Sequence, residues 1–263
     1  MTLKRVVIGL VVLVVIGGAV LFILDRTIFA PVEVNSAVPV APTLAPQSST
    51  GAQPAATASS NTSAAAPAAT AASSNASSSA ASASGQQVYK IDPAQSEVHY
   101  EVNETLFQDN RLNTAIGRTK GIAGEIAVNF TQPSQSQIGD IVIDVSQFTS
   151  DESRRDNFIR HTGLQSSTYP TATFKTTSIT GLPDKVAVGD DVKFTIAGDL
   201  TVKQTTKPVT WNAELKVGDK QINGSASTQI LMSDFGVGPL KLPILATEDQ
   251  VKLVFDFVAV PAQ

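Results

Sequence analysis

Residues 251–260 read VKLVFDFVAV, and this stretch decides the fold class of the chain. Apolar residues fill every odd-numbered position from Val251 to Ala259, whereas Lys252 and Asp256 interrupt the even-numbered ones. Successive side chains of a β-strand point to opposite faces, so this period of two indicates a strand with one dry and one wetter face. The sequence therefore favours a sheet that buries one side.

The same alternation recurs upstream, between breaker pairs such as Gln132-Pro133 and Gly218-Asp219. We expect eight strands, with residues 88–92 as a lead-in, at 96–104, 114–130, 138–148, 171–181, 191–203, 207–217, 220–232 and 249–260. One interruption, residues 151–160, is helical in character, because Asp151 is a suitable N-cap and Phe158 lies on an apolar edge. The sequence predicts an all-β domain with one short helix.

Short connections between these strands predict antiparallel neighbours. Eight such strands with one dry face can close into a barrel or stack as a sandwich. The length of 114–130 favours a barrel, and Gly117, Gly121 and Gly124 would let that strand bend. We therefore predict an eight-stranded antiparallel barrel, which has room for packed side chains or for one small ligand.

The N-terminal region contains an uncharged apolar run, VVIGLVVLVVIGGAVLFIL, at residues 6–24. As a helix it would be about 28 Å long, enough to span a hydrocarbon core. Lys4 and Arg5 precede it, so the positive-inside rule places residues 1–5 in the cytoplasm. We predict a single-pass cell-membrane protein whose C-terminal domain lies in the periplasm or at the cell surface. A cleaved signal peptide is the alternative, although Pro31 directly after the nearest candidate cleavage site disfavours it.

A low-complexity segment connects the apolar run to the strands. Residues 34–89 contain no charged residue and consist mostly of Ala, Ser, Thr, Pro, Gln and Asn. Such a segment cannot bury enough apolar surface to offset the entropy of ordering it. We therefore predict a disordered tether at residues 31–86 and a folded domain at residues 87–262.

The composition disfavours several function classes. The chain has no cysteine and only two histidines, His99 and His161, so thiol chemistry is excluded and a zinc site is disfavoured. The net charge is −4 without a basic patch, which argues against nucleic acid as a partner. No phosphate loop, serine elbow or calcium loop is present. We predict no metal, no cofactor and no catalysis; a lipid hydrolase or isomerase is an alternative that would need an acid or a histidine facing the interior.

Six sequence elements of the folded domain occur in the order and spacing of a known family. They are Tyr89-Lys-Ile-Asp-Pro93, Gly121-Ile-Ala-Gly124, Arg155-Asp156 with Phe158, Tyr169-Pro170 with Phe174, Gly198-Asp-Leu200-Thr201 followed by Thr206-Lys207, and Asp234-Phe235-Gly236. Over residues 88–260 they resemble the YceI-like family of bacterial lipocalin-like, polyisoprenoid-binding barrels. Gln95 and Glu104 depart from the family pattern, which usually has histidines near these positions, and Met232 replaces a frequent arginine.

The resemblance implies non-catalytic binding of a long isoprenoid or fatty-acyl-type lipid inside the barrel. The expected lining consists of apolar and aromatic side chains at dry-face positions: Tyr100, Phe107, Ile143, Phe158, Phe174, Phe194, Trp211, Phe235 and Phe255. Ordinary core packing is the alternative for each of them. A phosphate head group would be held by three cations, Arg154, Arg155 and Arg160, unless these arginines form structural pairs instead.

Two readings of the domain therefore stay open. One is a lipid-binding barrel tethered to a membrane, and the other is a filled barrel that serves as a structural or interaction module on a membrane stalk. A continuous apolar cavity would distinguish the first from the second. The oligomeric state is open as well, with a homodimer among the options.

Overall fold

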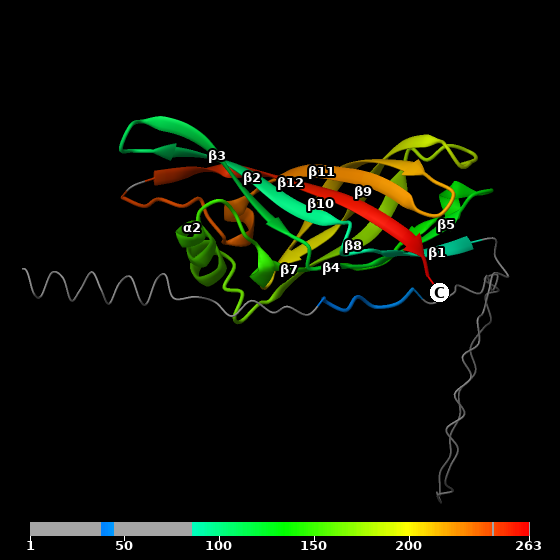
Figure 1. Cartoon of the computed structure of the whole chain (residues 1–263), viewed down its shortest axis with the longest axis horizontal. Helices are drawn as coiled ribbons and strands as arrows, with labels where there is room; N and C mark the ends of the chain where they lie inside the picture. The colour runs from blue at the N-terminus through cyan, green and yellow to red at the C-terminus, as the bar shows by residue number, and fades with distance from the viewer. Residues whose placement is uncertain (1–37, 45–85, 244, 263) are drawn as a thin grey trace, which may run out of the picture.

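The computed structural model describes residues 38–44, 86–243 and 245–262. Its regular structure is almost entirely β (Figure 1). The strands are β1 (Gln86–Ile91), β2 (Glu97–Leu106), β3 (Arg111–Thr119), β4 (Ile122–Ala123), β5 (Glu125–Asn129), β6 (Gln137–Ile138), β7 (Ile141–Asp144), β8 (Thr171–Thr180), β9 (Asp191–Val202), β10 (Thr205–Val217), β11 (Ile222–Leu231) and β12 (Leu245–Pro261).

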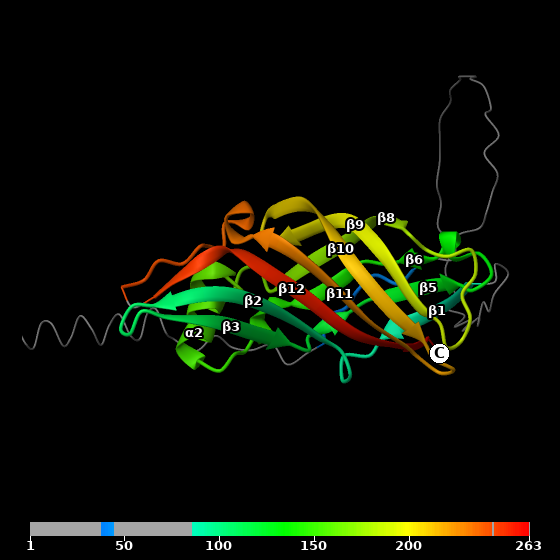
Figure 2. The same ribbon diagram turned by 90° about the horizontal axis from the view of Figure 1, so that it is seen from above.

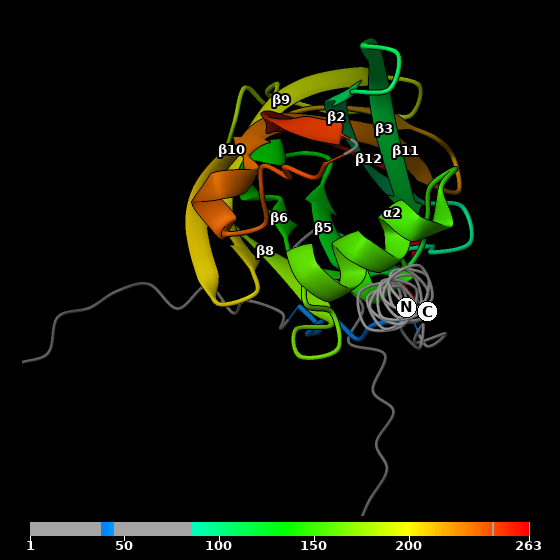
Figure 3. The ribbon, with the colours of Figure 1, turned by 90° about the vertical axis from the view of Figure 1, so that its left-hand side faces the viewer.

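All twelve strands belong to one sheet, and each strand pairing is antiparallel. The main path runs β4-β7-β8-β9-β10-β11-β12-β1-β5-β6, and β2 pairs with both β12 and β3. The sheet curls strongly, so that seen end-on its strands surround an interior (Figure 3). The predicted mostly-β, antiparallel architecture with a short helix is confirmed, and in place of the predicted barrel the sheet forms a strongly curled half-barrel. All strand pairings among the described residues fall within residues 86–261, so this segment contains the described sheet.

Strand β12 and the β3–β4 connection link the β2–β3 branch to the main path of the sheet. β12 is 17 residues long and pairs along one edge with β11, and along the other edge first with β2 and then with β1. The chain passes from β3 directly into β4, which pairs with β7. In addition, Arg118 and Thr149 exchange two backbone hydrogen bonds of 2.8 and 2.9 Å.

The predicted count of eight strands is wrong, chiefly because residues 114–130 do not form one strand. They are divided among β3, β4 and β5, and the chain changes direction near Gly121 and Gly124. A Cβ at Gly124 would lie 2.5 Å from the Cδ1 of Ile141, and one at Gly121 would lie 2.8 Å from the Cβ of Asp144. At Gly121 the close approach of the Asp144 Cβ therefore favours glycine, whereas at Gly124 the nearest atoms are the flexible ends of isoleucine side chains. The lead-in at 88–92 is also a full strand, β1, paired on both sides.

The helical interruption is confirmed, with different bounds. Helix α2 (Ser153–Phe158) continues into the π-helical turn η3 (Ile159–Gly163). Its N-cap is Glu152 rather than Asp151, because the Glu152 carboxylate accepts a 3.1 Å hydrogen bond from the backbone N–H of Arg154. Three short 3₁₀ turns complete the structure: η1 (Pro133–Gln135), η2 (Val145–Gln147) and η4 (Met232–Phe235). Helix α2 lies toward the end of the sheet at which the β2–β3 hairpin projects (Figure 2).

The predicted membrane helix, residues 6–24, and most of the predicted tether lie outside the described residues. Among the residues that the model does describe, no helix has both the length and the hydrophobicity needed to cross a bilayer. Residues 38–44 have neither helix nor strand but contact the sheet. The backbone N–H of Leu44 donates a 2.9 Å hydrogen bond to the Glu125 carboxylate, and the Leu44 side chain lies against Gly139.

Candidate functional site

The curled sheet encloses one continuous apolar cavity of about 230 Å³. At one end its lining includes Pro133 and Ser136, and at the other it includes Leu240 and Thr247. Almost every other lining side chain is aliphatic or aromatic, and the sheet strands contribute most of them. The interior is therefore neither solid with side chains nor lined with the polar groups that most reactions require.

The alternation of the strands explains why the lining is so uniform. Along β12 the cavity receives the odd-numbered side chains, which are Val251, Leu253, Phe255 and Phe257. The even-numbered Lys252 and Asp256 lie outside the cavity lining. The period-two pattern therefore predicts the inward face of this strand correctly.

Seven of the nine residues expected to line the interior do so: Tyr100, Ile143, Phe174, Phe194, Trp211, Phe235 and Phe255. Phe107 and Phe158 need correction, because neither belongs to the lining. Phe107 follows the last residue of β2 and is 51% exposed in the hairpin turn, where strand alternation no longer applies. Phe158 is half-buried at the end of α2.

Several large lining residues were not expected from the sequence. Among them, Phe148 packs against Tyr100 with ring centroids 5.4 Å apart, and Met232 reaches the cavity from η4. Both residues lie in or beside 3₁₀ turns, where a period of two gives no signal. Phe257, by contrast, stands in the alternating run at 251–260 and could have been found from it.

Trp211 is the most distinctive aromatic residue of the lining. Its ring packs edge-on against Phe174, with centroids 5.9 Å apart, and the residue is 9% exposed. Within the described part of the chain, its indole Nε1 is buried and has no hydrogen-bond partner. An unpaired buried donor costs about 1–3 kcal/mol relative to a paired one. The lining therefore contains one unused hydrogen-bond donor.

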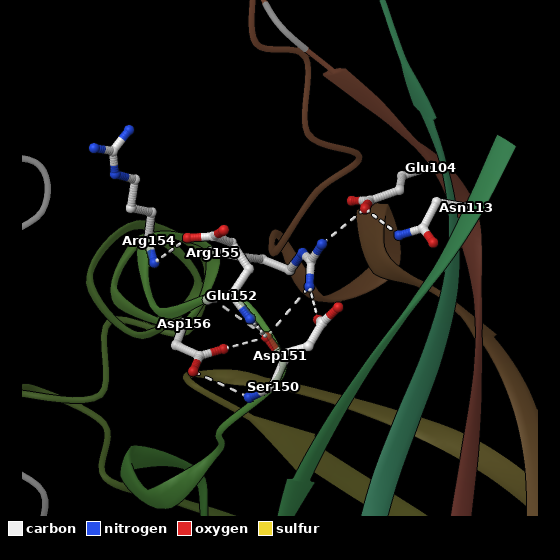
Figure 4. Close-up of polar contacts among 8 residues, drawn as sticks. All are labelled: Glu104, Asn113, Ser150, Asp151, Glu152, Arg154, Arg155 and Asp156. Atoms are coloured by element: carbon white, nitrogen blue, oxygen red, sulfur yellow. Dashed lines mark hydrogen bonds and ion pairs between the residues drawn. The ribbon is translucent and has the colours of Figure 1, made fainter. Parts of the chain in front are cut away.

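A polar cluster lies beside the cavity, between α2 and β2 (Figure 4). The Arg155 guanidinium donates to Glu104 at 2.8 Å, to Asp151 at 2.6 Å and to the Ser150 hydroxyl at 3.3 Å. Glu104 also accepts a 2.8 Å hydrogen bond from the Asn113 amide. Its side chain is 1% exposed and that of Arg155 is 13% exposed, so this ion pair is buried. The cluster fastens the helix to the sheet.

The other arginines of the helical segment have different surroundings. Arg160 is buried and donates to the Phe148 carbonyl at 2.7 Å and to the Asn157 side chain at 2.8 Å. Arg154 is exposed, and its side chain points away from the cluster (Figure 4). The expected three-arginine head-group site is therefore not formed, because Arg155 and Arg160 are held by protein acceptors.

Tyr100 connects the apolar cavity to the polar cluster. Its ring lines the cavity and lies over Gly117, where no larger residue would fit. Burial, helped by the negative charge of Asp156, raises the pKa of Tyr100 to about 12. Burial alone would lower the pKa of Arg155, but its hydrogen bond with Asp151 and the charge of Glu104 raise it above its usual value. Tyr100 and Arg155 therefore keep their protons at neutral pH.

Metal-binding and acid–base groups do not converge on the cavity in the parts of the chain that are described. No group of three His, Asp or Glu side chains could hold a metal ion there. His99 lies on the other face of β2 from Tyr100, with its Nε2 3.3 Å from a Glu101 oxygen. Its side chain is only 12% exposed, so it packs among the outward-facing side chains of the sheet.

Comparison with known proteins gives consistent results. The chain is 29% identical over 156 residues to Protein YceI of Escherichia coli, covering 57% of this chain and 75% of that protein. The crystal structure of BcnA from Burkholderia cenocepacia matches with a TM-score of 0.52 at 24% identity, over 65% of this chain and 99% of that one. A polyisoprenoid binding domain from Saccharophagus degradans matches with a TM-score of 0.49 at 14% identity, over 67% and 99% of the two chains.

The family model for the YceI-like domain matches residues 89–259, which is nearly the whole sheet. Its start coincides with the Tyr89 element and its end with the last inward positions of β12. This chain belongs to the YceI-like family.

Proposed function

We propose that this protein binds the chain of a long isoprenoid or fatty-acyl-type lipid inside its curled sheet, without catalysis. The observation that carries the proposal is the continuous apolar cavity, which has Pro133 in its lining at one end and Thr247 at the other. Family membership supports the same function. The cavity favours it over the alternative of a solid, purely structural barrel.

Burial of hydrocarbon supplies the driving force. Each CH₂ removed from water contributes about 0.8 kcal/mol, so even part of a long chain provides ample affinity. Ordering that chain costs entropy, and the contributions of the methylenes therefore do not simply add. Because the described lining offers almost no polar contact, we expect the site to discriminate poorly between apolar chains of similar width.

We further propose that the apolar run at 6–24 anchors the protein in the cell membrane, with the sheet on the extracytoplasmic side. Lys4 and Arg5 before the run support this orientation through the positive-inside rule. An anchor would hold the cavity next to the bilayer that stores its ligand, which raises the effective ligand concentration. In this arrangement the protein is a membrane-tethered lipid carrier.

Native mass spectrometry of residues 86–263, which contain the described sheet, tests the lipid-binding proposal. The protein would be purified from a bacterial host without detergent, and its bound material extracted into organic solvent. We expect a stoichiometric mass increment that extracts as a prenyl or acyl chain. The same spectra report whether the protein is a monomer or a homodimer.

A protein that carries no increment, and gains none after incubation with polyprenols and fatty acids, would contradict the proposal. That outcome would favour the structural or interaction module. A matched variant that fills the cavity, Ala226→Trp, should lose the increment if the lipid occupies the interior. If the increment persists in this variant, the lipid is bound elsewhere.

A further inference from the structure

Two hairpins lie side by side at one end of the sheet. The first joins β2 to β3 through the turn at residues 107–110, and the second runs from Leu240 to Thr247. Leu240 and Thr247 close the second hairpin with a backbone hydrogen bond of 3.0 Å and a side-chain hydrogen bond of 2.9 Å. The two hairpins are joined because Leu245 pairs with Leu106 across the β12–β2 ladder. We call this pair of hairpins, residues 104–113, 240–243 and 245–247, the tip.

The tip exposes large apolar side chains. Leu112, in β3, is 80% exposed, and Phe107, the first residue of the turn, is 51% exposed. Leu231, at the end of β11 nearest the tip, is 43% exposed. The two hairpins project together from one end of the sheet (Figure 1). Large apolar groups exposed on a protruding element are typical of a contact surface.

The tip is also one end of the cavity. Leu240 and Thr247, which close the second hairpin, both belong to the cavity lining. Thr247 pairs directly with Glu104 of the first hairpin. A ligand leaving the cavity at this end would therefore pass beside the hairpin that carries Phe107 and Leu112.

Chain length and an exposed lysine favour a bilayer as the partner of this surface. Lys241 is exposed at the tip, whereas the exposed Arg111 lies 3.5 Å from the Asp109 carboxylate. A cationic side chain beside apolar ones is typical of proteins that lie in the lipid–water interface. Residues 38–44 are held against the sheet at Leu44, and only residues 25–37 separate them from the apolar run. Those residues span at most ~45 Å when fully extended. An anchored chain would thus keep its sheet within reach of the membrane.

We propose that the tip docks into the surface of the lipid bilayer, with Phe107 and Leu112 inserted among the lipids, and that the ligand enters the cavity there. This inference rests on the proposed lipid-binding function and adds the route of exchange. It assigns the tip as the entrance and the opposite end, around Pro133 and Val188, as the end that faces away from the membrane.

The absence of cysteine makes a site-specific test direct. The full chain, carrying Phe107→Cys labelled with an environment-sensitive fluorophore, would be reconstituted into phosphatidylethanolamine–phosphatidylglycerol vesicles. Val188→Cys is the matched control, since Val188 is similarly exposed, at 58%, at the opposite end. We expect the label at 107, but not at 188, to shift to the blue and to be quenched by nitroxide groups on the lipid tails. Equal quenching at both positions, quenching at neither, or failure of the chain to bind vesicles would overturn the proposal.

A transfer assay then connects docking to ligand entry. The double variant Phe107→Ser/Leu112→Ser should take up a fluorescent polyprenol from vesicles at least tenfold more slowly than the wild type. Val188→Ser should show the wild-type rate. Because the replaced residues are exposed, thermal unfolding should change little in either variant. An unchanged uptake rate in the double variant would contradict the tip as the entrance.

Delivering the same polyprenol from ethanol, without vesicles, separates the two proposals. If the double variant binds normally by this route and slowly from vesicles, both proposals hold. If the wild type binds by neither route, the lipid-binding function fails, whereas the quenching result still decides whether the tip docks.

Discussion

The apolar cavity and the polar cluster beside it are built on opposite principles. The cavity collects many apolar side chains from most of the strands. In the cluster, a few charged groups from two segments far apart in sequence meet with defined hydrogen bonds, such as the 2.8 Å contact of Arg155 with Glu104. Tyr100 belongs to both, since its ring lines the cavity and its pKa responds to the acids of the cluster.

Because of this difference, the cavity lining governs lipid binding and the polar cluster governs the stability of the fold. A lining built from many equivalent contacts tolerates change at any one position and gives affinity through buried area. A buried ion pair contributes little net stability to the fold. Removing one of its partners is nevertheless costly, because the remaining buried charge cannot be solvated. We therefore expect substitutions in the cluster to affect folding, and substitutions that fill the cavity to affect lipid binding.

Glu104→Ala should have the largest effect on stability. It leaves the Arg155 guanidinium partly buried with only Asp151 as an acid partner, and breaking a buried pair in this way costs about 3–5 kcal/mol. Urea unfolding of residues 86–263 measures the loss. The double variant Glu104→Leu/Arg155→Met is the control, because it removes both charges and should regain most of the stability. A double variant no more stable than Glu104→Ala would show that the pair is not the cause.

Ala226→Trp should have the next largest effect, on binding rather than folding. Ala226 is buried in β11 and lines the cavity, so an indole there would occupy the space of the ligand. We expect polyprenol affinity to fall at least tenfold, which corresponds to about 1.4 kcal/mol. Gln229→Trp, at an exposed position of the same strand, should bind as the wild type does. Equal losses in the two variants would mean that tryptophan perturbs the strand and not the cavity.

Asp151→Asn should have a smaller, pH-dependent effect. The hydrogen bond with Arg155 lowers the pKa of Asp151, so this contact stabilises the fold above the usual carboxyl pKa of about 3.9 and is lost as pH falls through the lowered value. Asp151 is 80% exposed, and the contribution at neutral pH should be well under 1 kcal/mol. Urea midpoints of wild type and variant should differ slightly at pH 7 and converge toward pH 3. A difference that widens in acid would contradict this assignment.

Arg154→Ala should change least. The side chain is exposed and points away from the cluster, so the free energy of unfolding should change by no more than about 0.5 kcal/mol. Polyprenol binding measured by the same fluorescence assay should also be unchanged. A marked loss of binding would instead support the sequence-based prediction that Arg154 contacts the head group of the lipid.

The sequence predicted most of the sheet because alternation and burial have the same cause. Strands β8 to β11 lie within two residues of their expected bounds, since each has one dry face and ends at a turn. The prediction failed at 114–130, where alternation continues across two glycine corners although the hydrogen-bonding partner changes from β2 to β7. Sequence pattern reports which face a residue occupies and not which strand lies beside it.

The cluster was missed for a different reason, although one signal was available. Glu104 continues the inward series of Val98, Tyr100 and Val102, so a carboxylate stands where an apolar residue is expected. A charge at such a position implies a buried partner. The identity of that partner could not be predicted, because Arg155 lies 51 residues further along the chain and reaches Glu104 only through the fold.

The position of β12 has a consequence for how the protein reaches its native state. Residue 89 pairs with residue 261, and β12 joins β11 to both β1 and β2. Strands β1 and β2 can complete their pairing with β12 only after this last strand has been synthesised. Pairing between residues so far apart in sequence is intrinsically slow. Until β12 arrives, the apolar lining is open to water and prone to aggregate. A nascent chain in this condition is a natural client for a chaperone, and a stop codon upstream of residue 245 should yield a product that is degraded.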